Sequence, residues 1–197
     1  MKGFNYKKAV QSLNFLASLS KGSMNSMKAL KLVWFADRLH LRKYSRPITN
    51  DIYYAMKFGP VASGARDLIG QNGLSEDELA YRNQFIDNSP DNKYFYISLN
   101  DVDTTVFSES ELELLRWSYE TFGGMSHFEI SKFSHHYPEW KKFEGEFGGE
   151  KSRFKMSYED FFLQADIPND PFGNVSELAL NYAREAYLEE KAIEETL

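Results

Sequence analysis

The chain has 197 residues, of which 42% are hydrophobic, so it is long and apolar enough to form one compact domain. The formal net charge of −6 argues against a general nucleic-acid binder, because such proteins are normally basic. Cysteine is absent, which excludes disulfides, cysteine zinc sites and thiol catalysis. No signal peptide or membrane-spanning run is visible, so we expect a cytoplasmic protein without a membrane partner.

Two helices are predicted at the start of the chain. The first covers 5–19 and ends near Gly22, because glycine is common just past the C-terminus of a helix. The second covers 27–44 and is apolar around most of its circumference, with Trp34 and Phe35 near its middle. A helix of this kind is normally central to a fold. We therefore expect the two helices to pack as antiparallel neighbours, with the second in the core.

The polar positions of this second helix are mostly cationic. Between residues 23 and 46 there are six lysines and arginines against one aspartate, a local net charge of +5. Four of the cations fall at steps of 3, 7 and 4, so they share one helix face: Lys28, Lys31, Arg38 and Arg42. This face can be read as a solvated surface or as a docking surface for an acidic partner, and composition does not choose between them.

A turn and a short strand follow the second helix. Pro47 cannot continue a helix, so the chain turns at 45–47. Residues 52–58 are rich in aromatics and alternate roughly between apolar and polar, which predicts a strand ended by Gly59-Pro60. A short helix over 63–68 should come next, with the Ser63 side chain as its N-cap.

The order of these motifs resembles the Panacea domain of SocA-like antitoxins, a family also met in phage-associated proteins. That family combines a KLLYFA-like helix, a Gly/Ser-Arg-Pro-Ile/Leu turn and an aromatic segment that ends in Tyr/Phe-Gly-Pro-Val. No single motif is specific, but the ordered set with these spacings is. The clear match covers 27–69, a weaker one reaches Trp140, and no similarity is seen beyond about residue 150. The matching residues are Lys31, Leu32, Trp34, Phe35, Ala36, Arg46, Pro47, Ala55, Lys57, Phe58, Gly59, Pro60 and Val61.

The middle of the chain adds a second predicted strand. Residues 75–78 form a capping box that opens a short helix. The turn-rich segment 82–93 is predicted to be a surface loop. Residues 94–99 alternate between aromatic, β-branched and polar side chains, so we expect a strand there that pairs with 52–57. These strands would form a small β element on a helical body.

Two further capping boxes, at 108–111 and 126–129, open helices over 109–122 and 126–135. The pair is similar in outline to a helix-turn-helix. A DNA reader needs Arg, Lys, Asn or Gln on the outer face of its second helix, and this helix offers only Lys132 and histidines. The composition favours a structural pair over a DNA-binding one.

The end of the chain is predicted to be a helical extension. The Gly- and charge-rich segment 144–152 is the best candidate boundary, which divides the chain into a Panacea-type domain, 1–145, and an extension, 146–197. A final helix is predicted from about Val175 to Thr196, with Asn174 as its N-cap. From residue 176 onward six glutamates face one arginine and one lysine, a net charge of −4. This acidic helix could pair with the basic second helix inside the molecule.

Side chains that could support chemistry are sparse. Asp37 and His40 with His135-His136 contain metal-ligand types, but adjacent histidines usually point in different directions. Asp37 is equally suited to binding a cation or a backbone amide. Residues 149–152 lack the glycine that a phosphate-binding loop needs before its lysine. We therefore expect no catalytic residue, no metal, no cofactor and no enzymatic activity.

The resemblance implies a mainly α fold with a small β element (α+β) and the role of an antitoxin in a toxin–antitoxin system. Such a protein silences a cognate protein toxin encoded beside it, by direct binding or as an adaptor that delivers the toxin to a protease. We predict direct binding through the cationic face, Lys28, Lys31, Arg38 and Arg42. A homodimer and autoregulation by promoter binding stay open. Structural roles are predicted for the motif residues Trp34, Phe35, Pro47, Phe58, Gly59, Pro60 and Val61.

Overall fold

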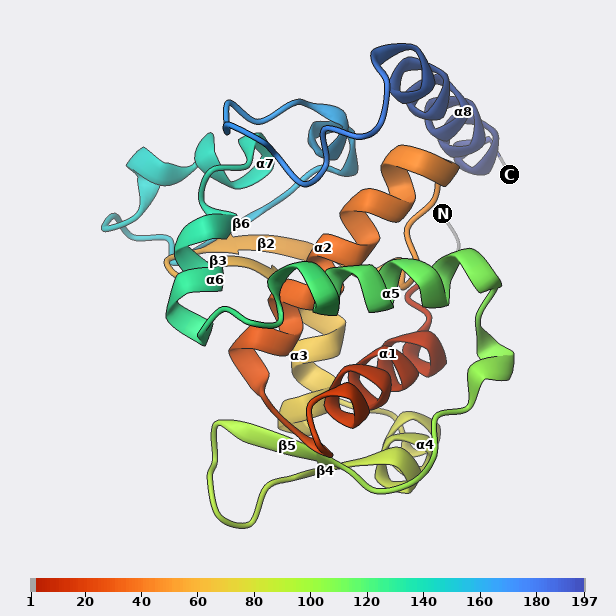
Figure 1. The fold of residues 1–197 in the computed structure, drawn as a ribbon, viewed down its shortest axis with the longest axis vertical. Coiled ribbons are helices and arrows are strands. Elements are labelled where there is room, and N and C mark those ends of the chain that lie inside the picture. The colour runs from red at the N-terminus through yellow and green to blue at the C-terminus, as the bar shows by residue number, and fades with distance from the viewer. Residues whose placement is uncertain (1–2, 197) are drawn as a thin grey trace.

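A long helix, α2 (Ser26–Tyr44), runs through the centre of the molecule in the computed structural model, which describes residues 3–196 (Figure 1). Its first turn is capped by Asn25, whose side chain accepts a hydrogen bond from the Lys28 amide, and Ser45 ends it in the left-handed region. Every residue from 29 to 42 is buried. The prediction of a central helix up to Tyr44 is confirmed.

The other elements surround α2, with α1, α5, α6, α8 and β3 packed directly on it. The remaining helices are α1 (Tyr6–Leu19), α3 (Ser63–Gly70), α4 (Glu76–Phe85), α5 (Glu109–Phe122), α6 (His127–Ser134), α7 (Pro138–Lys141) and α8 (Glu177–Glu195). The strands are β1 (Ser23–Asn25), β2 (Tyr53–Met56), β3 (Gly59–Ala62), β4 (Ile86–Asn88), β5 (Phe95–Ser98) and β6 (Arg153–Lys155). The mainly α fold with a small β element is therefore confirmed.

The strands form two separate antiparallel sheets, in the orders β1-β5-β4 and β3-β2-β6. The predicted strand over 94–99 exists as β5, but its predicted partner is wrong. β5 pairs with β1 and β4, whereas β2 pairs with β3 and β6. The reason is that each of these strands is the central strand of its own sheet, so both of its edges are already paired.

The hairpin of β2 and β3 corrects a second prediction. Gly59-Pro60 does not end the β structure: β2 ends at Met56, and Gly59 begins the returning strand. Gly59 has a φ of +94°, which suits glycine at the tight Lys57-Phe58 turn. Pro60 lies opposite Ala55, so the Gly-Pro motif builds the hairpin.

Three cap and loop predictions also differ from the structure. Ser63 is not the cap of α3, because the Asp51 carboxylate instead accepts hydrogen bonds from the Gly64 and Ala65 amides at 2.7 and 2.8 Å. The segment 82–93 is only partly a loop, since α4 continues through Phe85 and β4 follows. The cap of α8 is Ser176, not Asn174. The three capping boxes at Ser75, Ser108 and Ser126 are confirmed.

The segment after residue 145 packs on the same core as the rest of the chain. β6 extends the sheet of β2, and the short 3₁₀ turn at Tyr158–Phe162 lies against α2. Phe161, Phe162 and Phe172 belong to the main hydrophobic cluster with Trp34 and Phe35. The C-terminal segment therefore covers part of the central helix.

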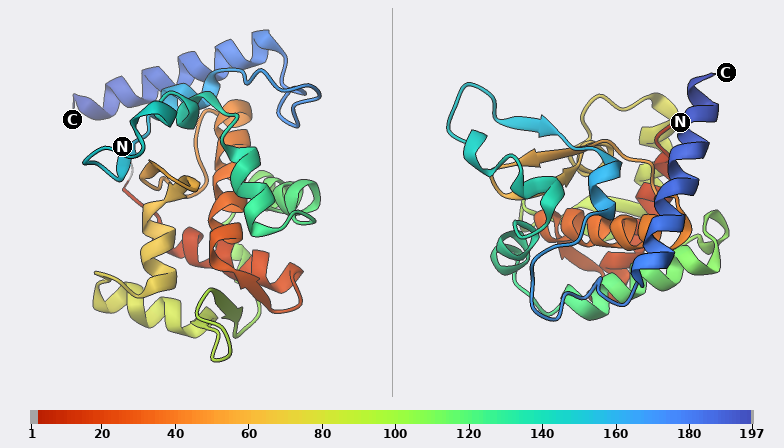
Figure 2. Two further views of the ribbon diagram at one scale, coloured as in Figure 1. Left: turned by 90° about the vertical axis from the view of Figure 1, so that its left-hand side faces the viewer. Right: turned by 90° about the horizontal axis from the view of Figure 1, so that it is seen from above.

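The last helix, α8, crosses the C-terminal half of α2 at one end of the molecule, and the β4–β5 hairpin lies at the opposite end (Figures 1 and 2). Its contact with the core is apolar and is made by Leu180, Ala183 and Tyr187. Its Lys191 pairs with Glu159 at 2.9 Å. Within residues 3–196, no helix combines the length and apolarity needed to cross a membrane.

Candidate functional site

Arg38, one of the predicted toxin-binding cations, is fully buried in the centre of the molecule. Its Nε donates to Glu139 Oε1 at 2.7 Å, and its Nη2 donates to the Leu163 carbonyl at 2.8 Å. The guanidinium lies 4.6 Å from the ring centroids of Tyr137 and Phe172, which stack around it as cation–π partners. Arg38 therefore joins α2 to α7 and to the C-terminal segment.

Arg42 lies one helical turn further along and is also buried. Its Nη1 donates to the carbonyls of Phe161, Phe162 and Leu163 at 2.9 to 3.1 Å. Burial, followed by the positive charge of Arg38, lowers its pKa to about 10, so the group stays charged at neutral pH. The two arginines hold the turn after β6 in place by its backbone.

Lys31 is buried beneath the β2–β3 hairpin. Its Nζ donates to the Pro60 carbonyl, and a side chain at Gly59 would meet the same ammonium group. Burial lowers the pKa of Lys31 to about 7. Lys28, at the start of the helix, is only partly exposed and donates to the Gly123 carbonyl.

The expectation that these four cations form one exposed face is therefore wrong for three of them. Lys31, Arg38 and Arg42 are at most 2% exposed, because carbonyls and one carboxylate from distant parts of the chain cover them. Whether a toxin contacts any of the four stays a prediction. In this conformation, Lys28 alone among the four has an accessible side chain.

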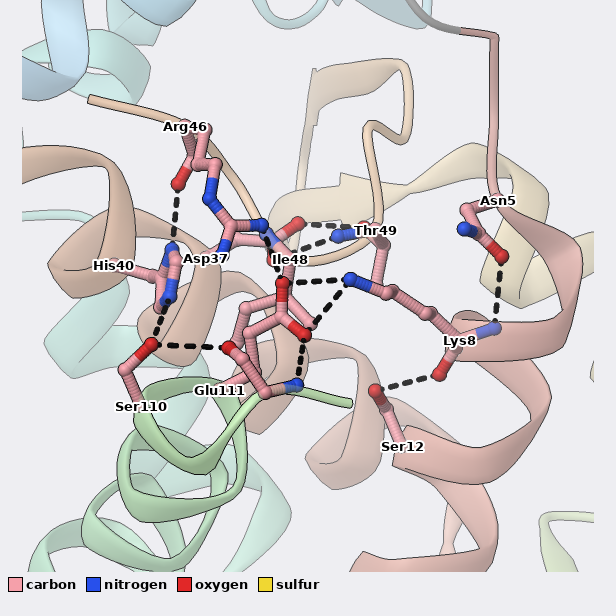
Figure 3. Close-up of polar contacts among 11 residues, drawn as sticks. Asn5, Lys8, Ser12, Asp37, His40, Arg46, Ile48, Thr49, Ser110 and Glu111 are labelled. Carbon is pink, nitrogen blue, oxygen red and sulfur yellow. Dashed lines mark hydrogen bonds and ion pairs between the residues drawn. The ribbon is translucent and has the colours of Figure 1, made fainter. Parts of the chain in front are cut away.

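Asp37 anchors the loop that follows α2 (Figure 3). Its carboxylate accepts hydrogen bonds from the Ile48 and Thr49 amides at 2.8 and 3.2 Å, from the Thr49 hydroxyl at 2.6 Å and from the Tyr53 hydroxyl at 2.8 Å. Burial nevertheless raises its pKa to about 6, which these bonds partly oppose. Of the two roles predicted for Asp37, the backbone-amide role is the one observed.

A second polar network joins the same loop to α1 and α5 (Figure 3). Glu111 accepts hydrogen bonds from Lys8 at 2.6 and 2.8 Å and from Arg46 at 2.7 Å, and it also closes the capping box at Ser108. His40 contacts the Arg46 carbonyl through Nδ1 at 2.7 Å and Ser110 Oγ through Nε2 at 3.1 Å. The loop 45–50 is therefore held from two sides.

Both nitrogens of His40 are thus engaged by the protein, and the pair His135-His136 lies elsewhere. His135 stacks on Trp140 with a centroid distance of 3.7 Å and an interplanar angle of 2°, whereas His136 is exposed. Among the described residues, no group of three or more Asp, Glu or His side chains is placed to hold a metal ion.

Two hollows flank the loop 45–52 on the surface. One is about 260 Å³ and lies between this loop, Lys8 and α8. The other is about 500 Å³ and is walled by the rings of Phe4, Tyr53, Phe161 and Tyr187, with lysines at its edge. Tyr158, Tyr187 and Lys191 line both hollows, so α8 borders each of them. Sequence reasoning missed this surface because its walls come from segments more than 100 residues apart.

The motif residues divide into buried and exposed positions. Buried ones are Trp34, Phe35, Pro47, Gly59 and Pro60, and Val61 is half-buried. Phe58, at the tip of the β2–β3 turn, is 53% exposed, although a structural role was predicted for it.

The helix pair α5 and α6 is joined by a short turn, as predicted. The exposed residues of α6 are Phe128, Glu129 and Lys132, so this helix presents one cation and one anion to solvent. Nothing in this surface adds to the DNA-binding interpretation.

The fold and the contacts therefore define a mainly helical protein in which buried polar side chains hold distant segments together. The two hollows lie beside the loop 45–52 and α8. A family model described as "Antitoxin SocA-like, Panacea domain" matches residues 30–141. That match spans more than half of the chain, so the protein belongs to the SocA-like Panacea antitoxin family. No curated protein and no solved structure matches it.

The matched region contains most of the central helix, the β2–β3 hairpin, α5, α6 and α7. It includes Arg38, Arg42 and Glu139, whereas the carbonyls of residues 161–163 that the two arginines bind lie beyond it. The segment with β6 and α8 lies beyond it. The family resemblance read from 27–69 is thereby confirmed.

Proposed function

We propose that this protein is an antitoxin that neutralises a cognate protein toxin, encoded beside it, by direct binding and without catalysis. The observation that carries the proposal is the Panacea-domain match over residues 30–141. The encounter would take place in the cytoplasm, where both proteins are made. A prophage setting is compatible with the family but is a separate proposal.

The packing of the molecule supports direct binding. Asp37 and Glu111 fix the loop 45–50 by hydrogen bonds to its backbone and to Arg46, so this loop is pre-organised beside two hollows. A pre-organised surface loses little conformational entropy on association, which favours tight complexes.

The cationic residues predicted to bind the toxin are divided between two proposed roles. Lys28 could contact an acidic toxin surface directly, because its side chain is partly exposed. Lys31, Arg38 and Arg42 would act indirectly by holding the hairpin and the segment 161–163 in place. Their replacement would then abolish neutralisation through loss of the fold.

Co-expression with the adjacent open reading frame tests the proposed function. The neighbouring gene is induced alone and then together with this protein, while growth is followed and the two proteins are purified. Growth arrest that is relieved by co-expression, with a stable complex, is the expected result. Relief with loss of the toxin and no complex would indicate a proteolytic adaptor instead. A harmless neighbour would contradict the antitoxin proposal, and promoter binding would then be measured across salt concentrations.

Size determination of the purified protein, alone and in the complex, would fix the stoichiometry. It would also test the predicted option of a homodimer. A concentration-independent monomer that binds one toxin is the simplest result compatible with direct contact.

A further inference from the structure

The outer face of α8 carries large apolar side chains that point into solvent. Leu178, Tyr182 and Ile193 are 66%, 65% and 62% exposed, and they lie on the side opposite the buried Leu180, Ala183 and Tyr187. At 1.5 Å per residue the exposed set spans about 22 Å. An amphipathic helix normally buries its apolar stripe and exposes its polar one. Here the helix has a second, interrupted apolar stripe, formed by Leu178 and Tyr182 with Ile193 further along, and no element among the described residues covers it.

The charge around this outer stripe is acidic. Glu185 and Glu189 are exposed and lie between Tyr182 and Ile193 on the same face. The segment from Ser176 to Leu197 contains six glutamates against one arginine and one lysine. A partner that covers the stripe must therefore offer apolar contacts to the three hydrophobic side chains and positive charge to the glutamates between them.

We infer that the outer face of α8 is the surface that docks the toxin, and that the toxin presents an apolar groove edged by lysines or arginines. This inference rests on the proposed antitoxin function and assigns its partner surface. The mode is a helix laid into a groove, in which side chains four residues apart, such as Leu178 and Tyr182, act as anchors. The glutamates raise the association rate with a basic partner.

A second copy of this chain fits the same surface less well. If two α8 helices packed antiparallel through their outer faces, the glutamates at positions 185 and 189 of both copies would gather at the crossing. Like charges at the centre of an interface oppose association. Charge complementarity therefore favours a basic partner over self-association.

The position of α8 suits a role in partner choice. It lies on the outside of the molecule at the end opposite the β4–β5 hairpin, beyond the region that the family model matches (Figure 2). Its inner face is held by the core, so the outer face is presented on a fixed support. A docking surface on a rigid element needs little rearrangement on binding.

A matched pair of tyrosines makes the test specific. Tyr182 on α8 and Tyr94 on the β4–β5 hairpin are 65% and 62% exposed, so they differ in location but not in residue type or exposure. The variants are Tyr182→Ser, the triple variant Leu178→Ser/Tyr182→Ser/Ile193→Ser, and Tyr94→Ser as control. Each is purified as the full chain and compared with the wild type by circular dichroism and thermal unfolding.

Binding is measured against the purified protein encoded by the adjacent gene. We expect Tyr182→Ser to weaken the complex by about 30-fold, as for an interface hot spot, and the triple variant to abolish it, while Tyr94→Ser binds like the wild type. Glu185→Gln/Glu189→Gln should slow association and reduce its dependence on salt. Unfolding temperatures should stay unchanged in all of these variants.

The outcomes separate the two proposals. If wild type relieves growth arrest and forms a complex that the triple variant forms equally well, the α8 inference is overturned and the antitoxin function stands. If the wild type neither relieves arrest nor binds, the antitoxin proposal fails and the α8 inference fails with it. A third outcome is that the wild type self-associates with rising concentration and Tyr182→Ser does not. This would assign the outer face of α8 to a second copy of the chain and overturn the inference that it docks a basic toxin.

Discussion

The two long helices of this protein both bury apolar side chains, but they differ in where their remaining side chains lie. The central helix α2 buries Lys31, Arg38 and Arg42, whereas the terminal helix α8 exposes Leu178, Tyr182 and Ile193. In α2 the charged groups are enclosed by carbonyls, a carboxylate and aromatic rings. In α8 these three exposed side chains have no such enclosure among the described residues, although Leu180, Ala183 and Tyr187 on the inner face are buried. The first helix is built to hold the fold, and the second has a face suited to a partner.

The comparison shows why charge in a sequence is a poor guide to a binding surface. A buried cation costs several kcal/mol of desolvation, so it persists only where the fold supplies compensating contacts. Such a group belongs to the scaffold. A large exposed apolar side chain has an unfavourable contact with water that a partner can remove. This contrast predicts large losses of stability at the buried cations of α2 and small ones on the outer face of α8.

The first prediction concerns Arg38. Replacement by methionine removes the partner of the buried Glu139 and should lower the free energy of unfolding by about 3–5 kcal/mol. Chemical denaturation measures the change. Removing both charges in Arg38→Met/Glu139→Leu should recover a large part of the loss, because no carboxylate is then left unpaired. A single variant as stable as the wild type would contradict a scaffold role for Arg38.

The second prediction concerns the hairpin above Lys31. Gly59 has a φ of +94°, and a Cβ there would lie 2.3 Å from Ser134 Oγ and 3.0 Å from Lys31 Nζ. Gly59→Ala should therefore destabilise the protein by about 2–3 kcal/mol, from backbone strain and crowding together. Gly124→Ala is the matched control, because its added methyl group meets no atom within 4 Å. Equal unfolding midpoints for the two variants would show that the hairpin adapts freely.

The third prediction concerns pH and His135, which stacks on Trp140. Burial, followed by the positive charge of Lys31, lowers its pKa from 6.5 to about 4. The unfolded state then binds more protons between those pH values, so this group makes the protein less stable as pH falls from about 6.5 to about 4.

His135→Phe keeps a ring against Trp140 and removes the titration. Its stability should fall less steeply than that of the wild type across the same pH range, as measured by denaturation at several pH values. Identical slopes for the two proteins would show that protonation of His135 does not destabilise the fold.

The smallest expected effect is on the stability of α8. Leu178→Ser, Tyr182→Ser and Ile193→Ser replace exposed side chains, so each should change the free energy of unfolding by less than about 0.5 kcal/mol. Thermal unfolding measures it. A loss similar to that of Arg38→Met would show that the outer face of α8 is part of the fold, and the contrast between the helices would disappear.

The sequence predicted what depends on local signals. The capping boxes at Ser75, Ser108 and Ser126 and the ends of α2 were located because their partners lie within a few residues. The family motif located the centre of the fold from residues that lie close together in the chain.

What could not be predicted depends on distant segments. The partners of Arg38 are Glu139 and Leu163, which are 101 and 125 residues away in the sequence. Helical spacing alone does not distinguish a cation that such distant residues bury from a cation exposed to water. The same limit applies to the pairing of β5, whose partners β1 and β4 are as short as the strand it was expected to join. The hollows beside the 45–52 loop have walls from three regions and no sequence signature.

The most direct test of the contrast is photo-cross-linking in the complex with the protein encoded by the adjacent gene. A benzophenone amino acid is placed at position 182 on α8, at position 94 on the β4–β5 hairpin, or at position 163 beside the buried arginines. Leu163 is 51% exposed, and its carbonyl is bound to Arg38 and Arg42. We predict strong cross-linking from position 182 and little from positions 94 and 163. Cross-linking from position 163 with none from position 182 would place the partner over the buried cations and contradict the account.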